Sequence, residues 1–294
     1  MTKANNQSDE KLLESIKHSH PPLGTIHRAY HYCSPSTLKA IIENRTIRLS
    51  DISKMNDSLE MEWGISILNQ SLEEKKQIIG EDHFVLIKEA IEDARAKTRF
   101  LISCFSREKD ILSQWRAYAD DGSGFSIGFS PKKLSDWKPG FGSVVYDKKE
   151  QLNIFESKIL TLNNIWRQSS GKSDKKFSTK IAIHLLFSSC FMKNSAFSEE
   201  KEVRFVHGIL YDHQISGFTI QSPPIGDRPV EIDFCIRSGQ FSPYIDINFP
   251  PDDHFIEEIV LGPKNQNLEI DIRAFTHKKG LSIQEINRSL ASYR

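Results

Sequence analysis

Residues 29–50 read AYHYCSPSTLKAIIENRTIRLS and place a strand, a helix and a second strand in close succession. The aromatic start at 29–33 is typical of a strand. Ser34 and Pro35 then mark a helix start, because serine caps free amides and proline is tolerated in the first helical turn. Residues 46–50 alternate apolar and polar side chains, as a half-buried strand does. This stretch predicts a fold that mixes helices and strands.

The rest of the chain continues this mixture without regular βαβ alternation. Helices are expected from about Asp57, at 81–97, after a capping Asp110, over most of 148–193 with a polar loop at 168–176, and at 268–279. Strands are expected at 100–105, 125–129, 203–207, 230–236, 244–247, 256–261 and 281–284. The order favours the α+β class over a doubly wound sheet. We expect a mobile lead-in over 1–24 and a single α+β domain over 25–294.

Composition and charge exclude several classes of protein. The 294 residues include 39 basic and 39 acidic side chains, so net charge gives no case for nonspecific binding to nucleic acid or membranes. No apolar run approaches the roughly 20 residues that span a bilayer, and the polar N-terminus lacks a signal-peptide core. The four cysteines are far apart, which argues against disulfides and structural zinc. We therefore expect a cytoplasmic protein without a metal.

Two early blocks of polar residues are candidates for a site. In the first, His31 lies at the end of a strand, where a ring nitrogen can face a ligand hydroxyl, and Ser34 follows it. The alternative is an aromatic core with a half-buried histidine. In the second, Asn56 and Asp57 precede a helix, and Glu60 completes a pattern that is also typical of a simple turn and cap.

A third block follows the strand expected at 100–105. Ser106 comes at the end of that strand, where a side chain can emerge at the sheet edge. Trp115 and Tyr118 share one helix face and could stack on a planar ring if they are exposed. If that face points inward, the pair belongs to the core instead.

A fourth block contains Glu200, Glu202 and Arg204 at alternate positions before an apolar strand. In a strand these three side chains point to one face. Buried charges are costly without partners, so the face is either solvated or part of a site. A glutamate beside a sugar stabilises an oxocarbenium-like transition state, and an arginine can orient that glutamate or bind a phosphate.

Together the four blocks resemble the bacterial domain-of-unknown-function family 2971. The matching motifs are the aromatic strand at 30–32, the Asn-Asp-x-x-Glu turn at 56–60, Cys-Phe-Ser at 104–106, Trp-x-x-Tyr-Ala-Asp at 115–120, and Glu-x-Glu-x-Arg at 200–204. The resemblance extends over about 26–284, with Phe197 in place of the usual tryptophan. The family name implies no activity.

The layout also resembles ADP-ribosyltransferases, particularly toxins of that fold that modify DNA. This resemblance implies a split mixed β-sheet with flanking and inserted helices, and NAD as substrate. It implies Glu202 and His31 as catalytic residues. It also implies that NAD contacts come from Tyr32, Ser34, Ser106, Trp115, Tyr118 and Arg204. Cys33 departs from the threonine that is usual in the first motif.

The expected activity is transfer of ADP-ribose to a macromolecular acceptor, either nucleic acid or protein. Such a transferase would suit a toxin or an antiphage defence effector, and so implies an antitoxin or a defence-system partner. Two alternatives remain open. One is a non-catalytic ligand-binding or sensor module on the same fold. The other is a metal-independent RNase with His31 and Glu202 as acid and base.

Overall fold

The computed structural model describes residues 26–55, 60–135, 140–168, 175–220, 230–249 and 254–293. The lead-in expected at 1–24, the turn at 56–59 and most of the loop expected at 168–176 lie outside the described residues. The strands are β1 (Ala29–Cys33), β2 (Thr46–Asp51), β3 (Thr98–Ser106), β4 (Phe125–Phe129), β5 (Phe141–Ser143), β6 (Glu202–Asp212), β7 (Gly217–Ile220), β8 (Ile232–Arg237), β9 (Gln240–Asn248), β10 (Ile256–Leu261) and β11 (Glu285–Arg288).

Helices connect and cover these strands. They are α2 (Pro35–Asn44), α3 (Glu60–Ile79), α4 (Glu81–Lys97), α5 (Leu112–Tyr118), α6 (Pro131–Ser135), α7 (Lys148–Gln168), α8 (Lys175–Ser189) and α9 (Glu269–Lys278). Short 3-10 turns lie at η1 (Ile52–Lys54), η2 (Asp120–Gly122) and η3 (Ser195–Glu200). The start of α2 is the one predicted, with Ser34 as its N-cap and Pro35 in the first turn.

The described strands form one 11-stranded sheet with the order β11-β10-β4-β1-β3-β2-β9-β8, and β6 carries β5 and β7 beside β3. The pair β10–β11 is parallel and the remaining named pairs are antiparallel. This confirms the α+β class and the mixed sheet. The chain folds this way because β3 and β6 are long apolar strands that pair at every position from Thr98–Leu210 to Ser106–Glu202.

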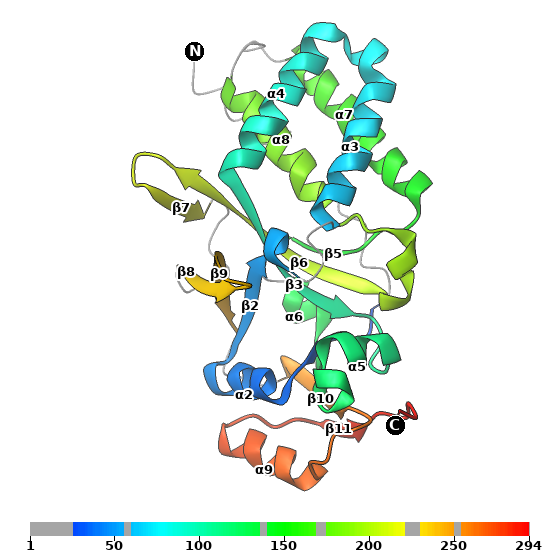
Figure 1. Ribbon diagram of the computed structural model, residues 1–294, viewed down its shortest axis with the longest axis vertical. Coiled ribbons are helices and arrows are strands. Elements are labelled where there is room, and N and C mark those ends of the chain that lie inside the picture. The colour runs from blue at the N-terminus through cyan, green and yellow to red at the C-terminus, as the bar shows by residue number, and fades with distance from the viewer. Residues whose placement is uncertain are drawn as a thin grey trace.

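The sheet separates two hydrophobic cores. Helices α3, α4, α7 and α8 gather as a bundle over one part of the sheet, and α2, α5 and α9 lie at the other end of the molecule (Figure 1). Alternate residues of β3 supply both cores, since Phe100 and Ile102 pack with the bundle whereas Leu101 and Phe105 pack on the opposite face. The charged site described below lies where the bundle meets β3 and β6.

Three local expectations differ from the structure. Asp110 does not cap α5, whose N-cap is Ile111 without a side-chain bond; the Asp110 carboxylate accepts hydrogen bonds from Trp115 Nε1 and from the C-terminal segment. The last strand is not 281–284 but β11, because pairing with β10 begins at Glu285. Glu200 ends the η3 turn and is not in a strand, so only Glu202 and Arg204 share a strand face.

Candidate active site

A split in the sheet creates the candidate site. On one edge, β3 pairs with β6 along its whole length. On the other edge, β3 pairs with β2 at Leu101 and Ile102 and with β1 at Ser106 only. Residues 103–105 therefore have no strand partner on that edge within the described register. Strands β1 and β2, which α2 connects, diverge across this gap.

A cavity of about 530 Å³ lies at the gap. Its lining includes Met55 and Cys104, which pack toward the helix-bundle core, and Ile41 and Phe105, which belong to the opposite core. The cavity therefore reaches side chains from both faces of the sheet. Its volume falls within the range of roughly 300–1,000 Å³ that is usual for ligand sites.

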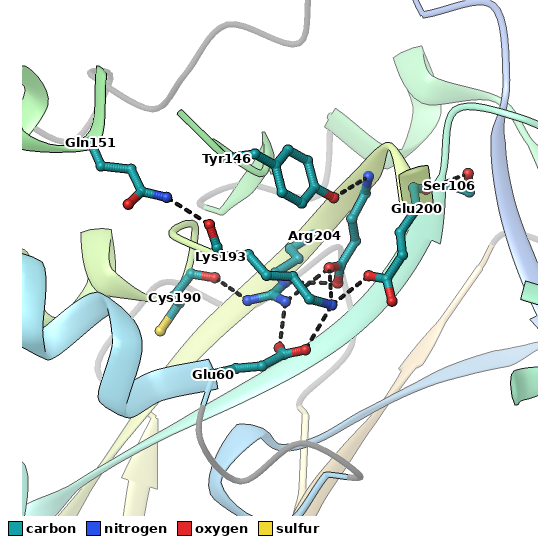
Figure 2. Close-up of polar contacts among 9 residues, drawn as sticks. Glu60, Ser106, Tyr146, Gln151, Cys190, Lys193, Glu200 and Arg204 are labelled. Atoms are coloured by element: carbon teal, nitrogen blue, oxygen red, sulfur yellow. Dashed lines mark hydrogen bonds and ion pairs between the residues drawn. The ribbon is translucent and has the colours of Figure 1, made fainter. Parts of the chain in front are cut away.

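Five ionisable side chains form one end of this cavity and the layer behind it; we call them the charged cluster. They come from the start of α3, the segment after α8, the η3 turn and β6 (Figure 2). The members of the charged cluster are Glu60, Lys193, Glu200, Glu202 and Arg204. Three carboxylates thus face two cations, which leaves the cluster one charge negative when every member is ionised.

Arg204 is the centre of the charged cluster and is completely buried. Its Nε donates to Glu202 Oε1 at 2.7 Å, and its Nη2 donates to Glu202 Oε2 at 2.9 Å. The remaining donors reach Glu60 and the backbone carbonyl of Cys190 (Figure 2). Burial alone would lower the pKa of Arg204, but Glu202 and Glu60 outweigh burial and raise it. The guanidinium therefore stays charged and fixes the Glu202 carboxylate.

Lys193 holds the three carboxylates together. Its Nζ lies 2.7 Å from Glu60 Oε1 and 3.1 Å from Glu202 Oε2, and it also donates to Glu200. Burial would lower the pKa of Lys193, whereas the charges of Glu202 and Glu60 raise it. Gln151 fixes the backbone of this segment, because its Nε2 donates to the carbonyl of Lys193 at 2.8 Å.

The two glutamates of the Glu-x-Glu pattern have opposite electrostatic character. Burial raises the pKa of Glu202, but Arg204 and Lys193 outweigh burial, so the pKa is lower than usual and the carboxylate is ionised. For Glu200, burial is the largest influence and outweighs Lys193, so its pKa is raised. Glu202 is therefore suited to stabilising positive charge, and Glu200 is the member most ready to hold a proton.

His31 enters the cavity from the other side of Cys104. Its Nδ1 lies 2.9 Å from the Cys104 carbonyl oxygen. Because a carbonyl only accepts, Nδ1 carries the proton and Nε2 keeps a lone pair. Burial lowers the pKa of His31 more than this bond raises it, so the ring is neutral. His31 and Glu202 thus line one cavity from either side of β3, and neither forms a hydrogen bond or ion pair with the other in the described structure.

The other predicted site residues divide into two groups. Tyr32 and Tyr118 line the cavity with His31 and Glu202. Ser34, Ser106, Trp115 and Arg204 are not among its lining residues.

Trp115 is completely buried and packs edge-on against Tyr32, so it is a core residue. Of the two aromatic residues on α5, Tyr118 is the one whose ring can contact a ligand. Ser34 caps α2, and Ser106 donates to the backbone of Glu200. Trp115, Ser34 and Ser106 therefore hold neighbouring elements of the site in place and do not line the cavity themselves.

Residues that the sequence did not single out complete the site. Lys193 is the most important, and the sequence offers no signal for it, since a single lysine between the apolar residues 190–192 and the polar residues 194–195 is an ordinary end to an apolar segment. The far end of the cavity is lined by Thr46, Arg48 and Ser50 on β2, Asp246 on β9 and Arg237 on β8. The alternation at 46–50 indicates that Thr46, Arg48 and Ser50 share a face, but it does not indicate that this face lines a cavity.

Within the described ranges, no group of three or more histidine, cysteine, aspartate or glutamate side chains is placed to hold a metal ion. In the same ranges, no helix is long and apolar enough to cross a membrane.

One part of the chain matches the sequence model of a known family. Residues 114–205 match the sequence model of a family described as protein of unknown function (DUF2971). The match contains Tyr118, Lys193, Glu200, Glu202 and Arg204 but stops short of His31 and Glu60, and it is narrower than the resemblance expected over 26–284. It supports the resemblance to that family. No curated protein and no solved structure matches the chain, so the likeness to ADP-ribosyltransferases has no support from these comparisons.

Proposed function

We propose that the cavity binds NAD and that the protein transfers its ADP-ribose group to a macromolecular acceptor. The observation that carries this proposal is that His31 and an ionised Glu202 line one cavity of about 530 Å³ at a split in the sheet. The fold class, with an open split between β1 and β2, is compatible with that of the transferases the sequence resembles.

The chemistry assigned to Glu202 follows from its charge. In the transfer, the bond between the ribose C1′ and the nicotinamide nitrogen breaks, and the electron pair leaves with nicotinamide. Positive charge then develops on the ribose, where a fixed carboxylate lowers its energy. The acceptor nucleophile forms the new bond to C1′ and releases a proton. Arg204 and Lys193 hold Glu202 ionised and in place for this step.

The remaining cavity residues take binding roles. The lone pair on His31 Nε2 accepts a hydrogen bond from a ribose hydroxyl. Tyr118 is 39% exposed and lines the cavity, so its ring is available to pack on nicotinamide. Arg204 acts through Glu202 as a positioning residue. Such an activity suits a toxin or an antiphage effector, and nucleic acid is one acceptor class to test.

The test is release of nicotinamide from NAD by the purified full chain, with nucleic-acid and protein acceptors supplied in turn. Glu202→Gln should reduce turnover by roughly a hundredfold or more, because it removes the negative charge at the reacting centre. Glu258→Gln is the matched control. Its carboxylate is also fully buried and accepts from Arg28, Tyr30 and Lys109, but it does not line the cavity. Equal inactivity of wild type and Glu202→Gln with all acceptors would remove the proposal.

One observation favours a second candidate, a non-catalytic binding or sensor module. Both oxygens of Glu202 already accept hydrogen bonds from Arg204, and Lys193 contacts Oε2 as well. A site that only binds a ligand requires the shape and charge of the cavity, but it does not require a Glu202 oxygen that is available to the reacting atoms. Thermal stabilisation by NAD that persists in Glu202→Gln, without turnover by wild type, would favour the module. RNA cleavage without NAD would instead select a metal-independent nuclease.

A further inference from the structure

The end of the cavity opposite the charged cluster is formed in part by the tip of the β8–β9 hairpin. Arg237 is the last residue of β8, and Ser238 and Gly239 make the turn with φ of 47° and 75°. Two successive left-handed residues are the pattern of a tight two-residue hairpin turn. The turn therefore fixes where the Arg237 side chain leaves the sheet.

Strand register places Arg237 on the cavity face of the sheet. Asp233 pairs with Tyr244, and Arg48 pairs with Asp246. Since side chains alternate along each strand, Arg237 and Asp233 share a face with Tyr244, Asp246 and Arg48. Of this set, Arg48, Asp246 and Arg237 line the cavity.

The two arginines at this end differ in their partners. Arg48 forms a two-point ion pair with Asp246, at 2.8 and 2.7 Å, and lies 3.6 Å from the centre of the Tyr244 ring. Arg237 is half-buried and forms no hydrogen bond or ion pair with the part of the chain that the structure describes. As far as the described residues show, its guanidinium is thus an unpaired positive charge at this end and is available to a ligand.

The cavity therefore has two ends of opposite charge. The charged cluster is one charge negative when every member is ionised, and the carboxylates of Glu200 and Glu202 are in the lining. Arg237 makes the far end positive. A matching ligand carries a cationic group at one end and an anionic group further along. NAD has this pattern, since its nicotinamide ring is cationic and its diphosphate is anionic.

We infer that Arg237 binds the diphosphate of the dinucleotide and thereby orients the nicotinamide toward Glu200 and Glu202. The inference rests on the proposed function for its choice of ligand. Arginine is well suited to this contact, because its planar guanidinium donates two parallel hydrogen bonds to phosphate oxygens. Arg237 is thus a specificity-determining residue for ligands with a diphosphate.

The test measures binding by calorimetry with three probes: NAD, ADP-ribose and the cation 1-methylnicotinamide. Arg237→Gln should weaken ADP-ribose binding by roughly tenfold or more, the usual effect of losing charge-assisted hydrogen bonds. Arg237→Gln should leave the affinity for 1-methylnicotinamide unchanged, whereas Glu200→Gln should weaken the binding of 1-methylnicotinamide. Arg116→Gln is the matched control, because Arg116 is exposed on α5, faces Tyr293 and does not line the cavity.

The outcomes separate this inference from the proposed function. ADP-ribose binding that depends on Arg237, without any consumption of NAD, supports the inference and counts against the transferase. Equal ADP-ribose affinity in wild type and Arg237→Gln overturns the inference even if NAD is consumed. If wild type binds none of the three probes but binds inorganic pyrophosphate through Arg237, the anion site stands and NAD is the wrong ligand. If the wild type binds neither these probes nor pyrophosphate, the inference about Arg237 and the proposed function are both overturned.

Discussion

At the scale of single residues, His207 makes stability depend on pH. It is 1% exposed on β6, and neither ring nitrogen has a hydrogen-bond partner among the described residues. Burial lowers its pKa to about 4, whereas an unfolded histidine titrates near 6.5. As pH falls from about 6.5 to 4, the unfolded chain gains a proton that the folded chain excludes. The folded state should therefore lose stability over this window, by up to roughly 3 kcal/mol from this residue.

The measurement is urea unfolding at several pH values for wild type and His207→Leu. His31 and His83 are also buried histidines with lowered pKa, so the difference between the two proteins isolates His207. The variant should lose less stability between pH 6.5 and 4. Parallel curves for the two proteins would contradict the assignment.

The charged cluster shows which site residues can be predicted from sequence. Glu202 and Arg204 stand two apart before an apolar run, so their shared face and the cost of burying them are visible in the sequence. The sequence does not decide whether these side chains are solvated, and the structure shows that both are buried. Glu60 and Lys193 are the partners that make burial tolerable. The 56–60 pattern marks Glu60 as a candidate but not its pairing with Arg204, and no local pattern marks Lys193, because the partners come from distant segments.

At the scale of elements, Gly64 sets how closely α3 and α8 approach. A Cβ atom at Gly64 would lie 2.3 Å from the carbonyl oxygen of Ser189, which is backbone and cannot rotate away. Alanine is normally the better helix former by about 1 kcal/mol. Here we expect Gly64→Ala to lower the free energy of unfolding by roughly 1–3 kcal/mol, because the helices must move apart.

Urea unfolding of Gly64→Ala and Ser66→Ala tests this close approach. Ser66 lies on the exposed side of the same helix and bonds only to the carbonyl of Trp63 in the described structure. Its replacement should change stability by no more than about 0.5 kcal/mol. A Gly64→Ala protein as stable as wild type would show that α3 and α8 adjust freely.

Elements with strong local signals were predicted well. Helix α4 begins and ends at the predicted residues, and β4 and β10 also match. Weaker signals failed where tertiary pairing decides the boundary. Strand β6 extends to Asp212 because β3 and β7 supply partners beyond the apolar run. The short strand β5 has no alternation of its own and exists through pairing with β6.

At the scale of the whole molecule, the charged cluster joins parts that the sequence keeps far apart. Glu60 begins the first helix of the bundle, Lys193 follows its last helix, and Arg204 lies in the central sheet. The sequence predicts an α+β chain but not this junction, since strand order depends on pairings between β3, β1 and β2 that are remote in sequence. The site is therefore also the place where the bundle is attached to the sheet.

Glu60→Gln tests whether this attachment makes bundle and sheet one cooperative unit. The change removes the ion pairs of Glu60 with Arg204 and Lys193, while Glu200 and Glu202 still balance the two cations, so we expect a loss of about 1–3 kcal/mol. We expect amide hydrogen exchange to become faster in both α3 and β6. Glu62→Gln is the control on the same helix, because Glu62 pairs with Arg95 on the surface, where a pair contributes about 1 kcal/mol or less. Faster exchange confined to α3 would show instead that the bundle unfolds separately from the sheet.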